Sequence, residues 1–289
     1  VLKGRVDGLE ARVGELEATQ FSTTTKLVGQ TSFVIGANSF GGNDDAATDA
    51  ASALEGGTVF NYDLRLNLNT SFTGEDLLRT RLRAGNFDNS PFGPTNISTS
   101  NGGITWDGAF GGLNTLEVAS ATGDAVTVDR IYYQFPVGDD FTATFGALVR
   151  QDDMLAVWPS NYDSSETMLD FFTYAGAPGA YSLTNGGGGG ISWESDGFSI
   201  SASYVSSNAD NGRPEHSLTE VCTTDSGGDS TCSGLIVPGG GLGTDASAST
   251  GTVQIAYTQE QWGVAGAYSY NSGDNGAGLY SGNATPNAW

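Results

Sequence analysis

Strict alternation of apolar and polar residues is the feature that most constrains how this chain can fold. In the segment TVFNYDLRLNLNTSF, one face of an extended strand would carry Phe60, Tyr62, Leu64, Leu66, Leu68 and Phe72. The opposite face would carry Asn61, Asp63, Arg65, Asn67 and Asn69. Strands of soluble proteins usually have ~5 to 6 residues. A longer strand with one apolar and one wholly polar face is typical of a transmembrane barrel, which has lipid outside and water inside.

The same alternation recurs along the chain. The segment DLLRTRLRAGNFD places Arg79, Arg81 and Arg83 together on one face, and weaker alternation follows in AVTVDRIYYQFPV and FTATFGALVR. Tight-turn residues predict hairpins across residues 138–140, 196–197 and 258–261. Longer polar stretches lie between these hairpins, as in bacterial barrels with short periplasmic turns and long external loops. The pattern supports about ten strands, fewer than the ~16 of a general porin.

The run NGGGGG at residues 185–190 lacks the Lys and the following hydroxyl residue of a phosphate-binding loop. We therefore expect it to form a flexible external loop.

Composition removes several classes of protein. A formal net charge of -22 disfavours a nucleic-acid-binding protein, which needs clustered cations to neutralise phosphates. No stretch approaches the ~18 consecutive apolar residues of a spanning helix, so a chain that crosses a bilayer would have to do so as a closed barrel. An aromatic content of 10% argues against a disordered chain.

The first twenty residues follow a different period. Alternating spacings of four and three residues form a heptad seam, made of Leu2, Val6, Leu9, Val13 and Leu16. The favoured interpretation is an oligomeric coiled coil, because Gly4, Gly8 and Gly14 would leave a short isolated helix too weak to persist. A short amphipathic helix packed on its own domain is the alternative. We therefore divide the chain into a coiled-coil segment, 1–20, and the N-terminal part of a barrel, 21–289.

The arginines are the informative charges. Six of them fall on the polar faces of predicted strands: Arg65, Arg79, Arg81, Arg83, Arg130 and Arg150. A charge on the lipid face would cost ~2 to 4 kcal/mol at mid-bilayer, so all six are predicted to line the pore, and so is Asp63, which shares a polar face with Arg65. They could attract anions and create a transverse field, or they could pair with inward carboxylates such as Asp63 to hold the barrel wall. Both interpretations stay open.

Catalytic and metal chemistry find little support. The one histidine, His216, lies in a loop without a nucleophile motif, and the adjacent carboxylates Asp152 and Asp153 are expected to be loop solubilisers. No enzyme activity, cofactor or metal site is predicted, since the acidic Gly-rich stretches lack EF-hand spacing. The cysteines Cys222 and Cys232 are close in a loop-like stretch, which favours a local disulfide in an oxidising compartment.

Two segments resemble a known family. The junction GRVDGLEARVGELEATQFSTTTKLVGQTSFVIGAN, residues 4–38, is similar to that between coiled coil and barrel in the major outer-membrane porins of cyanobacteria, the iron uptake porin family. The similarity continues through LRLNLNTSFTGEDLLRTRLRAGNF. In that family an S-layer homology domain, which contacts peptidoglycan, precedes the coil, and the barrel is related to carbohydrate-selective porins. That domain is absent here, and SGNATPNAW lacks a closing strand, so we expect a fragment of a longer protein.

The resemblance implies a homotrimer, contact with membrane lipid, and location in the outer membrane of a Gram-negative-type envelope. The alternation of Val and Leu in the heptad seam would by itself favour a coiled coil of two helices, so the trimer depends on the resemblance alone. It also implies passage of inorganic ions and small organic solutes, including carbohydrates, and a role in iron uptake.

The sequence therefore predicts an all-β fold, a transmembrane antiparallel β-barrel with a short helical coiled coil, of which this chain covers only part. The leading functional hypothesis is a passive, weakly selective diffusion pore. A structural tether between outer membrane and peptidoglycan is one alternative. A soluble extracellular β-rich adhesin is the other.

Overall fold

The computed structural model describes residues 24–94, 114–159, 168–170, 172, 177, 180–224, 230–272 and 287–288. Its helices are α2 (Asp45–Glu55) and the 3-10 helix η1 (Gln151–Met154). Its strands are β1 (Thr25–Gly36), β2 (Val59–Thr70), β3 (Leu77–Gly85), β4 (Thr127–Val137), β5 (Phe141–Arg150), β6 (Asn185–Ser195), β7 (Phe198–Ser206), β8 (Ser217–Thr224), β9 (Ser230–Val237), β10 (Ser249–Thr258), β11 (Gly263–Asn271) and β12 (Asn287–Ala288).

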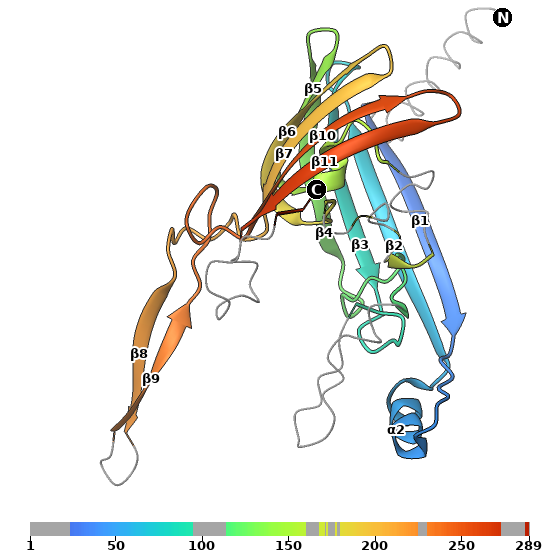
Figure 1. Cartoon of the computed structure of the whole chain (residues 1–289), viewed down its shortest axis with the longest axis vertical. Helices are drawn as coiled ribbons and strands as arrows, with labels where there is room; N and C mark the ends of the chain where they lie inside the picture. Colours follow the sequence, from blue (N-terminus) through green and yellow to red (C-terminus); the bar gives the residue numbers. More distant parts are fainter. Residues whose placement is uncertain are drawn as a thin grey trace, which may run out of the picture.

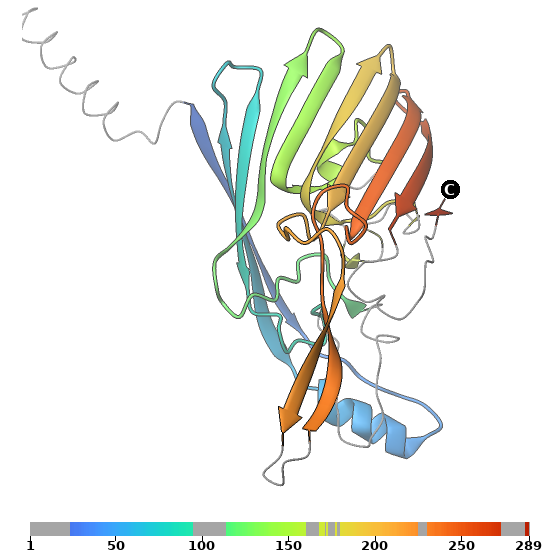
Figure 2. The same ribbon diagram turned by 90° about the vertical axis from the view of Figure 1, so that its left-hand side faces the viewer.

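The strands form one large antiparallel sheet and a separate hairpin. The large sheet has ten strands in the order β1-β2-β3-β4-β5-β6-β7-β10-β11-β12, and β8 pairs only with β9. Apart from this inserted hairpin, each strand therefore lies beside its neighbour in sequence. The sheet is strongly curved, with loop segments on its concave side (Figures 1 and 2). Within the described residues it is open, because β1 pairs only with β2.

Connections differ in length at the two ends of the sheet. The turns 71–76, 138–140, 196–197 and 259–262 are short and lie at one end, uppermost in Figure 1. The connections 37–58, 86–126, 151–184 and 207–248 are long and leave the sheet at the other end, where α2 and the β8–β9 hairpin project (Figure 1). The chain enters β1 at the short-turn end, where the Ser71 amide donates to the Thr24 carbonyl. The predicted alternation of short turns and long loops is confirmed.

Local turn chemistry fixes the hairpins. Asp196 and Gly197 both have positive φ, 50° and 83°, which is the backbone of a type I′ turn that matches strand twist. In the β2–β3 turn, Asp76 accepts hydrogen bonds from the Thr73 amide at 2.7 Å and from the Tyr133 hydroxyl at 2.7 Å. Burial acts against the charged form, yet these bonds and one from Ser71 hold the pKa of the Asp76 carboxyl well below its usual range.

The glycine run was predicted to be a flexible external loop, and this prediction is wrong. Residues 185–190 are the first half of β6, hydrogen-bonded between β5 and β7. A Cβ on Gly188 would lie 2.1 Å from the Tyr204 carbonyl oxygen, so only glycine permits this close approach of neighbouring backbones. A Cβ on Gly190 would lie 2.8 Å from the Ala202 carbonyl oxygen and 3.1 Å from Met154 of η1. The run therefore makes room for η1 on the concave face.

Other expectations have mixed outcomes. The predicted polar loop before β2 contains the helix α2, which Asp44 caps by accepting from the Ala47 amide at 3.1 Å. The predicted coiled coil, 1–20, lies outside the described residues, and the division at residue 21 stays a prediction. The backbone register places Cys222 opposite Cys232 in the β8–β9 hairpin and not in an irregular loop. The disulfide stays a prediction. No helix in the described part of the chain is long and apolar enough to span a membrane.

Candidate channel lumen

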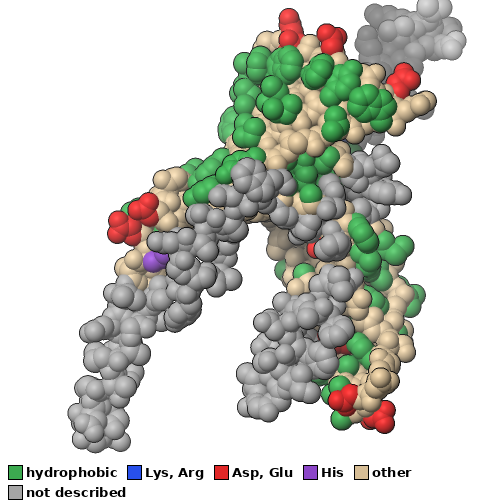
Figure 3. All heavy atoms as spheres, viewed as in Figure 1, with side chains coloured by type: hydrophobic (Ala, Val, Ile, Leu, Met, Phe, Trp, Pro, Cys, Tyr) green, Lys and Arg blue, Asp and Glu red, His purple; other side chains and the backbone are tan. Residues whose placement is uncertain are grey.

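The sheet has the inverse polarity of a soluble protein. On its convex face, large apolar side chains are exposed, with Phe33 at 71% and Ile255 at 59%. On its concave face, polar side chains are buried, with Asp63 at 1% and Gln254 at 1%. Figure 3 shows hydrophobic side chains over the upper part of the molecule, with acidic side chains at its tips. Soluble proteins rarely expose so large an apolar surface, so this face is suited to lipid.

Aromatic side chains gather towards both ends of the convex face. Near the short turns, the Tyr133 ring lies 6.4 Å from Phe72 and 6.0 Å from Phe145. Towards the long loops, Phe33 and Phe60 lie 6.1 Å apart. Phe60 and Phe72 are twelve residues apart, or ~40 Å along a strand, and a tilt of ~40° converts this to a height of ~30 Å. This height fits the apolar band of an outer-membrane barrel between two aromatic girdles.

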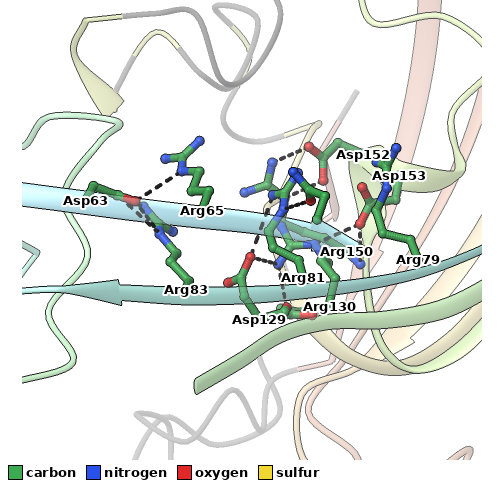
Figure 4. Close-up of polar contacts among 12 residues, drawn as sticks. Asp63, Arg65, Arg79, Arg81, Arg83, Asp129, Arg130, Arg150, Asp152 and Asp153 are labelled. Atoms are coloured by element: carbon green, nitrogen blue, oxygen red, sulfur yellow. Dashed lines mark hydrogen bonds and ion pairs between the residues drawn. The ribbon is translucent and has the colours of Figure 1, made fainter. Parts of the chain in front are cut away.

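Strand register brings the arginines of the concave face against one another. Arg65 of β2 lies directly opposite Arg83 of β3, and Arg81 of β3 lies opposite Arg130 of β4. Like charges directly across a strand pair destabilise a sheet unless something neutralises them. Carboxylates do so in two groups (Figure 4).

Asp63 is the centre of the first group. Its carboxylate accepts from Arg65 Nε at 3.3 Å and from Arg83 Nε at 3.1 Å. Both guanidinium groups also donate to the backbone carbonyl of Glu117, at 2.9 Å from Arg65 and 3.4 Å from Arg83. The Glu117 carboxylate lies 3.4 Å from Arg65. The Asp63 carboxylate thus joins the arginines of β2 and β3, and both arginines hold the β3–β4 connection through Glu117.

The second group joins β3 and β4 to the 3-10 helix. Arg130 Nε donates to Asp153 Oδ2 at 2.8 Å, and Arg130 Nη1 lies 3.1 Å from Asp129 Oδ2. Arg81 Nη1 lies 3.6 Å from the same Asp129 oxygen, and Arg150 pairs with Asp152. Asp152 and Asp153 were expected to be loop solubilisers, and that expectation is wrong. They face inward because η1 turns the chain onto the concave wall directly after β5.

Arg79 is held differently from the other five arginines. Its Nε donates to Asn69 Oδ1 at 3.1 Å, and its guanidinium carbon lies 5.8 Å from the centre of the Tyr132 ring. Within the part of the chain that the structure describes, no carboxylate pairs with it. Its positive charge is therefore stabilised by an amide and an aromatic face, and these partners do not cancel it.

The β5–β6 connection, 151–184, is fastened to the concave wall. Gln151 is fully buried; its Oε1 accepts from the Ser182 amide at 2.7 Å, and its Nε2 donates to the Thr252 hydroxyl. Gln254 Nε2 donates to the Tyr181 hydroxyl at 2.8 Å. Met154 of η1 packs in a small apolar cluster with wall residues, namely Tyr132, Val149 and Val205. The connection thus occupies space inside the curve of the sheet.

The β3–β4 connection lies beside it. Leu116 and Leu169 form an antiparallel bridge, and the Asp170 amide donates to the Thr115 carbonyl at 2.9 Å. The side chains of Asp170 and Glu117 are hydrogen-bonded to each other. Burial raises the pKa of the Asp170 carboxyl, although Arg150, the hydrogen bond with Glu117 and Arg83 act in the opposite direction.

All seven residues predicted to line the pore lie on the concave face, but with different exposure. Three are almost completely covered: Asp63 at 1%, Arg65 at 4% and Arg130 at 2%. The side chains of Arg81 and Arg83 keep 17% and 20% of their exposure. Contact with a passing solute stays a prediction for the whole set. The sequence pattern did not predict the carboxylates Glu117, Asp129 and Asp170. Only Asp129 could have been suspected from the sequence, because it directly precedes Arg130.

A curved antiparallel sheet with an apolar convex face and a charged, hydrogen-bonded concave face defines the class of outer-membrane β-barrel channels. A family model described as "Carbohydrate-selective porin, OprB family" matches residues 1–277. The chain belongs to that family.

Two relatives match a large part of this chain. The protein alr4550 of Nostoc sp. is 36% identical over 230 residues, which are 75% of this chain and 37% of that protein. The protein sll0772 of Synechocystis sp. is 30% identical over 266 residues, 86% of this chain and 43% of that protein. The chain thus spans less than half the length of these relatives.

Among solved structures, the high-pH structure of Pseudomonas putida OprB matches with a TM-score of 0.47 and 11% identity, over 90% of this chain and 54% of that chain. A mutant of Rh. blastica porin matches with a TM-score of 0.35 and 14% identity, over 86% and 74%.

Proposed function

We propose that the protein containing this chain forms a passive diffusion channel for small hydrophilic solutes in the outer membrane. The observation that carries the proposal is the inverted polarity of the sheet. A face of exposed Phe, Ile and Leu side chains can contact lipid, while the opposite face carries charged and hydroxyl side chains. A sheet of this kind surrounds a hydrophilic path once it closes.

Charge balance inside the curve supports weak selectivity. Among the described residues, the concave face carries six arginines, Arg65, Arg79, Arg81, Arg83, Arg130 and Arg150, against six carboxyl groups, Asp63, Glu117, Asp129, Asp152, Asp153 and Asp170. When all are ionised, the sum is zero. Paired charges of both signs offer donors and acceptors to neutral, hydroxyl-rich solutes, which agrees with the carbohydrate-selective name of the family. Passage of iron compounds is part of this proposal only because the sequence resembles the iron uptake porin family.

The β5–β6 connection is proposed to narrow the path. Its described parts lie on the concave side, and the wall residues Thr252, Ser201 and Gln254 hold them by hydrogen bonds near both ends of the connection. The second arginine–carboxylate group lies beside it, because Asp152 and Asp153 belong to η1 at the start of this connection. The narrowest part would therefore be bounded by β2–β4 on one side and by this connection on the other.

Planar-bilayer recording tests the channel directly. The full-length protein, purified in detergent, should give stepwise conductance, and liposomes that contain it should swell in neutral sugars. Triple replacement of Arg79, Arg81 and Arg83 by alanine should raise conductance by removing side-chain volume from the path. Absence of conductance steps in protein that retains its barrel would contradict the proposal.

A tether between outer membrane and peptidoglycan is the second candidate. The chain enters β1 at the short-turn end, so a segment before Thr25 would emerge on the periplasmic side if short turns are periplasmic. A homotrimer and a peptidoglycan-binding domain before the coil come from the resemblance. Normal solute uptake with a detached outer membrane in a deletion strain would favour the tether over the pore. The exposed apolar convex face weighs against the third candidate, a soluble adhesin.

A further inference from the structure

Five of the six concave-face arginines are occupied by carboxylates. Arg65 and Arg83 share Asp63, Arg81 and Arg130 share Asp129, and Arg150 pairs with Asp152. Arg130 also pairs with Asp153, at 2.8 Å. The distance between Arg81 and Asp129 is 3.6 Å. Arg79 differs, since its partners among the described residues are the Asn69 amide and the Tyr132 ring.

The contacts of Arg79 leave part of its guanidinium available. Its Nε is directed at Asn69 Oδ1, 3.1 Å away, and the plane lies near the face of Tyr132. Among the residues the structure describes, neither terminal nitrogen has a protein acceptor. The paired Nη groups of an arginine bind the two oxygens of a carboxylate or phosphate in a bidentate manner. Asn69 and Tyr132 thus orient the group and leave its binding edge open.

The ion pairs point to the same residue. Among the described residues, the other five arginines of the concave face have carboxylate partners. Arg79 therefore differs from them in having a positive charge with no described carboxylate beside it.

We propose that Arg79 is an oxyanion-binding residue in the lumen, oriented by Asn69 and Tyr132, and that it gives the pore its preference for anions. The inference rests on the proposed channel function. It assigns selectivity to one unpaired arginine and a supporting role in the wall to the paired ones. Its ligands are small anions with two oxygens on one centre, such as phosphate or a carboxylate.

The test compares single-channel records of the full-length protein with those of Arg79→Gln, Arg79→Lys and the control Arg213→Gln. Arg213 is exposed in the long β7–β10 connection, away from the lumen. Reversal potentials in a KCl gradient measure the anion-to-cation permeability ratio, and added inorganic phosphate measures oxyanion binding as a concentration-dependent reduction of chloride current. Heat-modifiable migration on gels checks that each variant forms its barrel.

Arg79→Gln should lower the permeability ratio roughly tenfold, because one unit charge ~6 Å from the path in water favours anions about threefold and disfavours cations about threefold. It should also abolish phosphate inhibition. Arg79→Lys should keep the ratio, because the charge remains, but weaken phosphate inhibition, because the bidentate edge is lost. Arg213→Gln should change neither. Conducting Arg79→Gln channels with an unchanged ratio and intact phosphate inhibition would overturn this inference alone. No conductance in the unsubstituted protein would overturn the channel as well.

Discussion

Replacement of Asp63 by asparagine tests whether the ion pairs hold the barrel wall. Asp63 is 1% exposed, and its two arginine partners lie directly opposite each other across β2 and β3. Asparagine preserves the shape of the side chain but removes the negative charge that offsets the repulsion between Arg65 and Arg83. Removing one partner of a buried ion pair typically costs ~3 to 5 kcal/mol. We expect a loss of this size in the free energy of unfolding.

The assay is denaturant unfolding of the full-length protein in detergent micelles, followed by tryptophan fluorescence. Asp139→Asn, an exposed change in the β4–β5 turn, is the matched control and should alter stability by less than ~0.5 kcal/mol. Adding Arg83→Gln to Asp63→Asn should recover part of the loss, because it removes one of the two opposed cations. Asp63→Asn protein as stable as the control would refute the idea that Asp63 neutralises this arginine pair.

Three further outcomes are expected. Gly190→Val should push Met154 off the wall and lower single-channel conductance, at a stability cost of ~1 to 3 kcal/mol, whereas Gly266→Val, whose Cβ would meet nothing within 4 Å, should not. Gln151→Ala should leave the Ser182 amide unpaired and make the open-channel current noisier, and a quiet current would show that the connection is held elsewhere. Because the pKa of Asp76 is lowered in the folded state, its stabilisation is present above pH ~4 and lost as the pH falls below it. The melting-temperature gap between the unsubstituted protein and Asp76→Asn should therefore narrow from pH 7 to pH 3, and an undiminished gap would contradict this.

Sequence patterns predicted the strands well where the two faces of a strand meet different solvents. The alternation of Leu64, Arg65 and Leu66 could be read directly, because lipid and water select opposite side chains. The pattern failed in β6, since a run of glycines has no side chains to alternate. The glycines of β6 are explained by the close approach of the backbone to Tyr204 and by the space that Met154 needs. Both are features of tertiary structure.

The site was predictable only in part for a similar reason. Strand periodicity placed all six arginines on one face, but it left open whether they would be paired. Their partners Glu117, Asp152 and Asp153 belong to connections, whose course across the concave wall depends on contacts far apart in the sequence. The bridge between Leu116 and Leu169 is one of these contacts. Pairing therefore became visible only with the structure.

The most direct test of the central claim is the environment of neighbouring residues along β2. Single spin labels at Leu66, Asn67, Leu68 and Asn69 of the full-length protein, with its native cysteines replaced by serine, would be measured in liposomes. The account predicts high collision rates with dissolved oxygen, which concentrates in lipid, at Leu66 and Leu68, and with a water-soluble nickel complex at Asn67 and Asn69. Equal accessibility at all four positions, or the reverse alternation, would contradict a barrel with lipid outside and water inside.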